Sequence, residues 1–389
     1  METKNTAQPP GAANEDINQA LGSLRQEIDA IDEQIVSHLA KRQAVVERVV
    51  ALKKKHKLPI YHPAREEDLI SMRRNQGKES GLNPDYIEEL YRSVLHQSRA
   101  EQAGHMSLKG IRPGASVLIL GGRGGMGRYF RHWFEDTGYE VRIMGRDGWS
   151  TIAQLCKGVD LAMLSVPIEV TGEIANRLGP YLHSDTILCD ITSVKEKPLK
   201  GMLDAHPGPV VGLHPLFGPT TSTMDKQIIV ATPGRDPEAC QWLLDQFSAW
   251  GSIVVSSSAR EHDEIMGIVQ ALRHFATFAF GQFLSRRKVD IQRTLEFSSP
   301  IYRLELGMVG RLFAQDSSLY SEIIFASPQR RALLKEYLAS LGANLEMLEK
   351  GDKTYFQKEF TRIAEWFGPF SEQAMRESTF LIDKLIERF

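Results

Sequence analysis

Residues Val117–Gly127 read VLILGGRGGMG and decide the fold of the central part of this 389-residue chain. Four consecutive apolar residues predict a buried strand, and the glycines then turn the chain into a helical segment over residues 128–134. Gly122, Gly124 and Gly127 have the G-x-G-x-x-G spacing of a dinucleotide-binding turn, in which glycine lets the backbone approach a pyrophosphate and the helix pack close to the strand. A glycine-rich turn without a ligand is the alternative, and the strand before it and the helix after it favour the nucleotide site.

The bulk composition restricts the class of protein. A chain of 389 residues is too long for one ordinary core and predicts two or three domains. Its 42% hydrophobic and 25% charged residues are typical of a soluble globular protein, and a net charge of -2 argues against nucleic acid as a partner. Three cysteines without C-x-x-C spacing suit the cytoplasm better than a disulfide framework or a metal site. No apolar run is long enough for a membrane span.

Apolar runs continue after the glycine turn and alternate with helix-length segments. This alternation predicts a mostly parallel sheet of the Rossmann, dinucleotide-binding type over residues 105–257. The predicted strands are Val141–Met144, Leu161–Val166, Thr186–Ile191, Val210–Leu213, Gln227–Ala231 and Ser252–Val255. Ligands bind at the carboxyl ends of such strands, where three loops carry polar groups: Ser165–Pro167, Asp190–Lys195 and Gly212–Pro219.

The end of the second predicted strand bears on the choice of cofactor. An acid at this point usually binds the adenosine ribose, but the chain reads Met144-Gly145-Arg146-Asp147. Glycine followed by arginine is the pattern of a 2′-phosphate site, which keeps NADP as an alternative. Asp147 reaches the ribose hydroxyls if the strand ends late, and NAD is then the cofactor.

The first hundred residues predict a helical domain. Residues 1–16 are polar and predict a disordered tail, whereas residues 17–55 predict one helix about 58 Å long with an apolar heptad seam. Arg42 interrupts this seam and needs an anion, because burying an unpaired charge is costly. Lys53 follows on almost the same helix face. A polar seam residue that fixes coiled-coil register is the alternative. Two shorter helices follow and cannot cover the first, so we expect it to pair with its copy in a second chain.

Motifs in this region resemble the all-helical chorismate mutase family. They are Leu24–Asp29, Ala40–Arg42, Lys53, Pro59–Ile60, Arg65–Glu66, and Ser98 with Gln102. In that family two chains swap their long helices and each site borrows one arginine, a role that falls here on Arg25. The resemblance implies that Arg42 binds a substrate carboxylate and that Lys53 and Gln102 hydrogen-bond the ether oxygen, while Arg65, Glu66 and Ser98 line the rest of the site. Some relatives carry aspartate where this chain has His62, which makes Glu66 the better candidate for the ring-hydroxyl contact.

The remaining chain is similar to the prephenate dehydrogenase family of the bacterial tyrosine pathway. The motifs are GLHPLFGP at 212–219, QALRHF at 270–275 and SPIYRLEL at 299–306. The resemblance implies that His214 accepts a proton from the C4 hydroxyl of prephenate, that Ser165 orients this base or the hydroxyl, and that Arg311 binds the ring carboxylate. Matching to the family also places Lys195, His206, His274 and Arg303 near the cofactor or the substrate, and each of these side chains could equally be structural. The other residues expected at the cofactor are Met126, Arg146, Asp147, Ser165 and Pro167.

Helical periodicity takes over from residue 258 to the C-terminus, where we expect a dimerisation domain. The predicted order is therefore a tail (1–16), an all-α chorismate mutase domain (17–104), an α/β Rossmann-type domain (105–257) and an all-α domain (258–389). These resemblances imply a cytoplasmic homodimer that converts chorismate to prephenate and oxidises prephenate with NAD, with tyrosine as a feedback inhibitor. The alternatives are a dehydrogenase whose helical domain only dimerises, and a redox sensor without catalysis.

Overall fold

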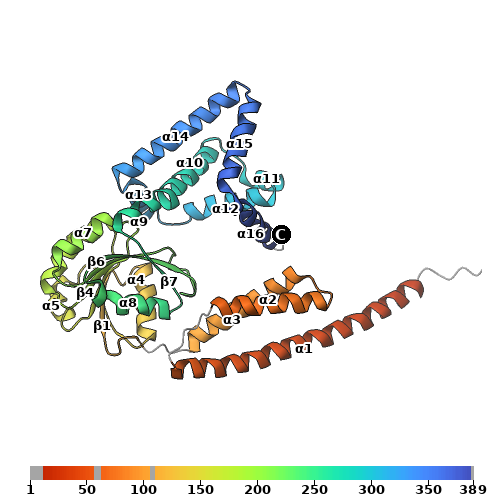
Figure 1. Cartoon of the computed structure of the whole chain (residues 1–389), viewed down its shortest axis with the longest axis horizontal. Coiled ribbons are helices and arrows are strands. Elements are labelled where there is room, and N and C mark those ends of the chain that lie inside the picture. The colour runs from red at the N-terminus through yellow and green to blue at the C-terminus, as the bar shows by residue number, and fades with distance from the viewer. Residues whose placement is uncertain (1–11, 57–62, 106–109, 387–389) are drawn as a thin grey trace, which may run out of the picture.

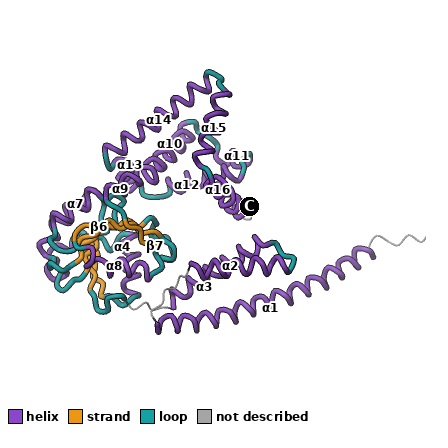
Figure 2. The backbone as a smooth tube through the Cα atoms, in the orientation of Figure 1, coloured by secondary structure: helices purple, strands orange, loops and turns teal. Residues whose placement is uncertain are grey.

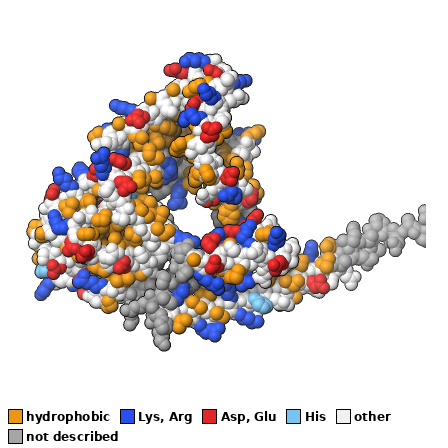
Figure 3. Space-filling model, viewed as in Figure 1, with side chains coloured by type: hydrophobic (Ala, Val, Ile, Leu, Met, Phe, Trp, Pro, Cys, Tyr) orange, Lys and Arg blue, Asp and Glu red, His pale blue; other side chains and the backbone are white. Residues whose placement is uncertain are grey.

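The computed structural model describes residues 12–56, 63–105 and 110–386, which form three bodies along the chain (Figure 1). Helices make up the first and last bodies, and all the strands gather in the middle one (Figure 2). Figure 3 shows that the three bodies surround an opening. The predicted sequence of an all-α, an α/β and a second all-α part is confirmed.

The first body contains α1 (Ala12–His56), α2 (Pro63–Glu79) and α3 (Pro84–His105). Helix α1 has 45 residues and is about 68 Å long, so it extends well past the other two helices (Figure 1). It begins inside the segment predicted as a tail, and residues 1–11 of that tail lie outside the described residues. The side chains of the predicted seam are half exposed, as Leu24 and Ile28 are at 56% each. One chain therefore leaves the apolar face of α1 largely uncovered.

The second body is a sheet with helices on both faces. Within the described range its seven strands have the order β2-β1-β3-β4-β5-β6-β7. All neighbouring strands are parallel except β5 and β6, whose antiparallel pairing the apolar pattern did not distinguish. The strands are β1 (Ser116–Leu120), β2 (Glu140–Met144), β3 (Leu161–Leu164), β4 (Ile187–Asp190), β5 (Val210–Pro215), β6 (Ile228–Arg235) and β7 (Ile253–Ser256).

Two apolar layers hold the helices on this sheet. Helices α4 (Gly125–Asp136) and α8 (Pro237–Ala249) pack on one face through buried aromatic rings such as Phe130 and Phe247. Helices α5 (Ile152–Leu155), α6 (Thr171–Leu178) and α7 (Glu196–Ala205) cover the other face. The central strands β1, β3 and β4 are fully buried, which is why they read as continuous apolar runs in the sequence.

The third body consists of helices that follow one another to the C-terminus. They are α9 (Ala259–Met266), α10 (Arg273–Arg286), α11 (Ile291–Glu296), α12 (Pro300–Phe313), α13 (Ser317–Phe325), α14 (Pro328–Glu349), α15 (Lys353–Phe367) and α16 (Pro369–Ile386). A π-helical segment, Gly267–Leu272, joins α9 to α10. Serine or aspartate side chains cap several of these helices, as Ser299 and Ser327 do at α12 and α14.

The surface of this third body is rich in apolar groups (Figure 3). Phe297, Phe325 and Trp366 are 75%, 69% and 77% exposed in the single chain. Large apolar patches on one chain commonly mark contact surfaces. Among the described residues no helix has both the length and the apolar character needed to cross a bilayer.

Candidate active sites

The glycine turn lies at the carboxyl end of β1, between that strand and α4. Gly121 has a φ of +81°, which favours glycine. A Cβ on Gly127 would lie 2.4 Å from the Gly121 carbonyl oxygen, so only glycine allows α4 to start this close to the strand. The turn therefore has the tight strand–helix geometry that places the N-terminus of a helix against a pyrophosphate.

The end of β2 is basic and open to solvent. Arg146 and Asp147 are both exposed, and the guanidinium of Arg123 lies beside Gly145. The Asp147 side chain does not cap the short helical turn that follows it. Both an acid and two cations are thus present where the adenosine ribose of a dinucleotide is bound.

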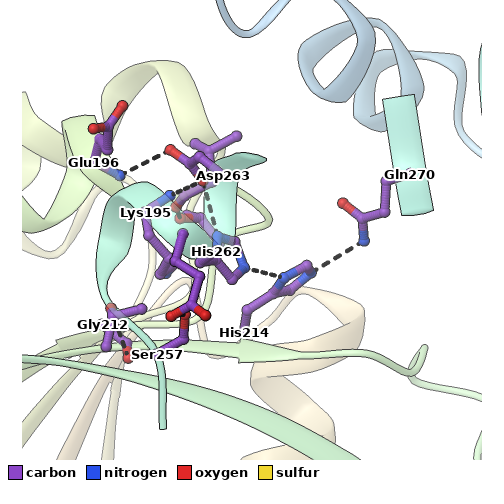
Figure 4. Close-up of polar contacts among 12 residues, drawn as sticks. Lys195, Glu196, Gly212, His214, Ser257, His262, Asp263 and Gln270 are labelled. Atoms are coloured by element: carbon purple, nitrogen blue, oxygen red, sulfur yellow. Dashed lines mark hydrogen bonds and ion pairs between the residues drawn. The ribbon is translucent and has the colours of Figure 1, made fainter. Parts of the chain in front are cut away.

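His214 is the centre of a hydrogen-bonded series that joins the sheet to the C-terminal helices (Figure 4). It lies in β5 and is 2% exposed. Its Nδ1 is 2.8 Å from Nε2 of His262 in α9, and Nδ1 of His262 is 2.8 Å from an Asp263 carboxylate oxygen. On its other side, Nε2 of His214 is 3.2 Å from the side-chain nitrogen of Gln270.

The direction of these bonds follows from the carboxylate at their end. The Asp263 carboxylate accepts only, so His262 donates from Nδ1 and its Nε2 is an acceptor. His214 then donates from Nδ1, which leaves the Nε2 lone pair unprotonated and facing the Gln270 amide, which donates to it. The series therefore fixes His214 in the tautomer that a general base requires.

The electrostatic surroundings keep this base neutral. Burial lowers the pKa of His214 well below its ordinary value, and the nearby Lys195, His262 and Arg330 add to the effect. Burial would raise the pKa of Asp263, but hydrogen bonds from His262 and from the backbone N–H groups of Glu196 and Lys195 outweigh it, so the pKa of Asp263 is lowered. An ionised Asp263 and a neutral His214 are the states that the hydrogen-bond directions require.

A buried ion pair supports the strand that carries His214. The Lys195 ammonium lies 2.5 Å from an Asp190 carboxylate oxygen and donates to the carbonyl of Leu213 at 2.7 Å. Both side chains of the pair are fully buried. Lys195 thus holds the backbone next to His214.

Ser165 and His206, predicted at the base and near the cofactor, have surroundings that differ from those expectations. Ser165 follows β3. Within the described residues its side chain makes no hydrogen bond to His214, because the two ring nitrogens of His214 face His262 and Gln270. His206 precedes β5 at the amino edge of the sheet, and its Nε2 is 2.6 Å from the Thr186 carbonyl. Ligands bind at the opposite edge, so this position gives His206 a structural role and does not support the predicted cofactor contact. Pro167 lies at the carboxyl edge, after β3.

The predicted substrate residues of the third body lie on α10 and α12. His274 is buried, its ring stands edge-on to Tyr320 with centroids 4.8 Å apart, and burial beside Arg273 lowers its pKa to about 4. Arg303 donates to the Leu295 carbonyl at 2.6 Å. Arg311 is exposed on α12. His274 is therefore a neutral donor or acceptor, and Arg311 the cation open to a ligand.

A cavity of about 880 Å³ lies between the sheet body and the C-terminal helices. Asp263 and Arg330 line it, whereas His214 does not, so the cavity adjoins the histidine pair and does not contain the base. Arg330 is 3% exposed, and its guanidinium donates to the Ile323 carbonyl at 2.5 Å. Sequence reasoning missed Arg330, His262 and the role of Gln270. The available signal for His262 was the Glu261-His262-Asp263 run in α9, the first helix after the last strand.

The second candidate site lies among the three N-terminal helices. Arg42 of α1 donates to the Ser98 hydroxyl of α3 at 2.5 Å. Burial lowers the pKa of Lys53, and the Glu66 carboxylate of α2 opposes that shift. The structure thus brings Arg42 to Ser98 and Lys53 near Glu66. Arg65 is exposed on α2. Gln102 belongs to α3, but its side chain lies outside the described part of the structure, as His62 does.

Arg25 lies apart from this group in a single chain. It is exposed and precedes Arg42 by 17 residues on α1, about 25 Å along the helix axis. No arginine side chain spans that distance. Arg25 can therefore join such a site only in another copy of the chain.

The two sites define a class of protein: a fused enzyme with a helical rearrangement site and a dinucleotide-dependent oxidation site. Comparison with known protein families agrees with this class for both sites. The type II chorismate mutase profile matches residues 24–103, and the nucleotide-binding and dimerization domains of prephenate dehydrogenase match residues 141–255 and 258–362.

Two curated relatives match nearly the whole chain. The T-protein of Enterobacter agglomerans is 42% identical over 93% of this chain and 97% of its own, and that of Haemophilus influenzae is 39% identical over 94% and 97%. The fold of the last two bodies is shared with a prephenate dehydrogenase from A. aeolicus, solved with hydroxyphenyl propionate and NAD+, at a TM-score of 0.53 and 19% identity over 67% of this chain and 98% of that one. The chain belongs to the T-protein family of bifunctional chorismate mutase/prephenate dehydrogenases. It is both an isomerase and an oxidoreductase.

Proposed function

We propose that His214 is the base of the dehydrogenase reaction and that the series His214–His262–Asp263 sets its tautomer. Nε2 of His214 accepts the proton of the C4 hydroxyl of prephenate, after Gln270 yields that position to the substrate. NAD supplies the hydride acceptor, and loss of carbon dioxide leaves the aromatic product, 4-hydroxyphenylpyruvate. The observation that carries the proposal is the directional hydrogen-bond series, which leaves Nε2 of a buried imidazole unprotonated.

The cofactor site is proposed at the carboxyl edge of β1, β2 and β3. Backbone groups of Gly122, Gly124 and Gly127, with the neighbouring Met126, receive the pyrophosphate, and Asp147 receives the ribose. Ser165 and Pro167 line the nicotinamide end. Arg146 and Arg123 would also suit a 2′-phosphate. Absorbance of reduced nicotinamide in the presence of prephenate, with NAD and NADP compared, tests the function: the faster rate should be with NAD, and no rate with either cofactor would refute the dehydrogenase assignment.

The carboxylate groups of prephenate need cations in the third body. We assign Arg311 to the ring carboxylate, because it is the exposed guanidinium of α12 in an otherwise apolar run. His274 and Arg303 complete this side as a neutral imidazole and a second cation whose position the Leu295 carbonyl holds.

Replacing Asp263 with asparagine should lower dehydrogenase turnover by roughly 10²–10⁴-fold. One amide oxygen cannot serve the backbone N–H groups of Lys195 and Glu196 and also His262. His262 and the Lys195 N–H share one carboxylate oxygen, so the amide oxygen keeps these two donors and the amide NH2 meets the Glu196 N–H. The uncharged side chain then no longer stabilises the positive charge that forms on the imidazole pair when His214 accepts the proton. Steady-state rates with prephenate and NAD measure the loss. Glu264→Gln, exposed on the same helix, is the matched control, and equal rates for the two variants would refute a role of Asp263 in the reaction.

In the mutase site, each polar side chain is assigned to the group of chorismate that it would bind. Chorismate rearranges within one molecule, so the site has only to hold the folded dicarboxylate and stabilise negative charge on the ether oxygen. Arg42 and Arg65 bind carboxylates, with Ser98 beside Arg42. Lys53 and Gln102 donate to the ether oxygen, and Glu66 accepts from the ring hydroxyl.

We propose a homodimer in which α1 of each chain covers the apolar seam of the other and supplies Arg25. Three findings support it: the exposed seam, the position of Arg25 far from Arg42, and the match of residues 258–362 to a dimerization domain.

The cytoplasm is the proposed compartment of the protein. Cys156, Cys189 and Cys240 are free and buried, as suits a reducing compartment.

Mixing two inactive variants tests the shared site. Arg25→Ala and Lys53→Ala should each lack mutase activity as homodimers. Co-refolding them in equal amounts should restore about a quarter of the wild-type activity, because half of the dimers are mixed and each mixed dimer has one intact site. Mutase rates before and after mixing measure this. If mixing restores nothing while each variant remains dimeric, Arg25 does not act on the partner's site.

L-Tyrosine is the proposed feedback inhibitor of the dehydrogenase site. It shares the hydroxyphenyl ring and the carboxylate of the reaction product and differs at the α-carbon, so groups that bind the product also fit tyrosine. Added tyrosine should raise the apparent KM for prephenate and leave the mutase rate unchanged. Inhibition by phenylalanine to the same degree would contradict recognition of the ring hydroxyl.

A further inference from the structure

A buried guanidinium joins the two enzymes of this chain. Arg99 follows Ser98 on α3, and its side chain is 8% exposed. Its Nη1 donates to both carboxylate oxygens of Glu66 at 2.6 Å, and its Nε donates to a carboxylate oxygen of Asp225 at 2.7 Å. Glu66 belongs to α2, whereas Asp225 precedes β6 in the sheet body. One arginine thus binds one acid from each domain.

This arrangement differs from the ion pairs of the molecular surface. The side chains of Glu66 and Asp225 are 16% and 10% exposed, whereas Arg92 of the same helix pairs with Glu67 at 48% and 64% exposure. Solvent screens the exposed pair, but removal of one partner of a buried pair leaves an uncompensated charge. Burial by itself would lower the pKa of Arg99; hydrogen bonds from Arg99 to Asp225 and Glu66 reverse this, so its pKa is raised and the guanidinium stays charged.

The acid that Arg99 holds is part of the proposed mutase site. Both oxygens of Glu66 are engaged by one nitrogen of Arg99, so the direction of the carboxylate depends on the direction of the guanidinium. The field of Glu66 in turn reaches Lys53. Charges therefore alternate from Asp225 through Arg99 and Glu66 to the proposed donor of the ether oxygen. The far part of α3 is also tied to another body, because Lys384 of α16 pairs with Glu89.

We propose that Arg99 is a positioning residue of the mutase site and that Asp225, in the dehydrogenase part of the chain, fixes its orientation. Asp225 holds Nε, which leaves Nη1 aimed at Glu66 for contact with the ring hydroxyl of chorismate. The mutase site is then complete only when the nucleotide-binding domain is docked on α3. This inference rests on the proposed role of Glu66 in the mutase reaction.

The test is Asp225→Asn in the full-length protein, a change that keeps the shape of the side chain and removes its charge. With chorismate as substrate, kcat/KM should fall roughly tenfold, which corresponds to about 1.4 kcal/mol. The dehydrogenase rate with prephenate and NAD should stay within about twofold, since Asp225 is outside that site. Asp245→Asn, an exposed acid on α8 of the same domain, is the matched control.

A double-mutant cycle separates positioning from a general structural effect. If Asp225 acts through Glu66, the Asp225→Asn change should cost nothing further in a Glu66→Gln background. Arg99→Gln should lose as much mutase activity as Glu66→Gln. Arg99→Lys should recover only part of that activity, because one ammonium group cannot hold both acids in the same geometry. Thermal melting of each variant shows that the fold is retained.

The possible contrary results lead to different conclusions. An unchanged mutase rate in Asp225→Asn, with Glu66→Gln impaired, overturns this inference and leaves the proposed function intact. An equal loss from Asp225→Asn in both backgrounds also overturns it, because the effect would not pass through Glu66. A wild-type rate in Glu66→Gln, or a wild-type chain without mutase activity, overturns the proposed role of Glu66 and this inference with it.

Discussion

Replacement of His214 by asparagine is expected to lower the dehydrogenase turnover by roughly 10³-fold or more while NAD still binds. The buried imidazole offers the unprotonated Nε2 that the reaction needs, and no asparagine atom has a comparable affinity for a proton. The asparagine side chain can still hydrogen-bond His262, so the fold should survive. Steady-state rates with prephenate measure the loss, and fluorescence titration with NADH measures cofactor affinity.

Two controls make this result specific. His132→Asn changes an exposed histidine of α4, whose side chain is 72% exposed, and should leave both activities unaltered. The mutase rate of His214→Asn should equal that of the wild type, because His214 belongs to the sheet body. Turnover within tenfold of the wild-type value would mean that another group accepts the proton.

Replacement of Lys53 by alanine is expected to have the opposite pattern: mutase activity falls by roughly 10³-fold and the dehydrogenase rate with prephenate is unchanged. Rearrangement of chorismate places negative charge on the ether oxygen, and a cation at that point stabilises the transition state more than the substrate. Loss of chorismate absorbance measures the mutase rate, and formation of NADH from prephenate measures the other activity.

Lys41→Ala is the matched control for this variant. Lys41 is exposed on the same helix, one residue before Arg42, so it has the same ammonium group outside the proposed site. An equal loss in both variants would point to damage to α1 and away from a specific role. A Lys53→Ala protein with normal mutase activity would remove Lys53 from the site.

Local patterns in the sequence predict much of this structure. The apolar runs locate the strands, and the glycine spacing locates the turn after β1, because burial and backbone sterics act on neighbouring residues. Arg42 on an apolar seam indicates a site because a charge there needs a partner. These inferences use residues that are close in the chain or that share one helix face.

Contacts between distant segments could not be predicted in the same way. His262 meets His214 across 48 residues, and Arg99 meets Asp225 across 126. Nothing in the periodicity of β5 or α9 specifies that their imidazoles meet; the packing of α9 against the sheet does. His206 is a residue for which the sequence suggested a contact that its position does not support. It lies at the amino edge of the sheet, whereas ligands bind at the carboxyl edge.

The two uncovered apolar surfaces, on α1 and on the C-terminal helices, set a condition on assembly. A self-complementary surface joins two copies about a two-fold axis, and a chain with two such surfaces forms a closed pair only if both axes coincide. If the axes differ, each chain recruits a second neighbour, and the assembly is a closed dihedral particle where the axes cross at a suitable angle and an open polymer elsewhere. The Arg99–Asp225 and Lys384–Glu89 contacts join the helical bodies to the rest of the chain, so the angle between the two axes depends on them.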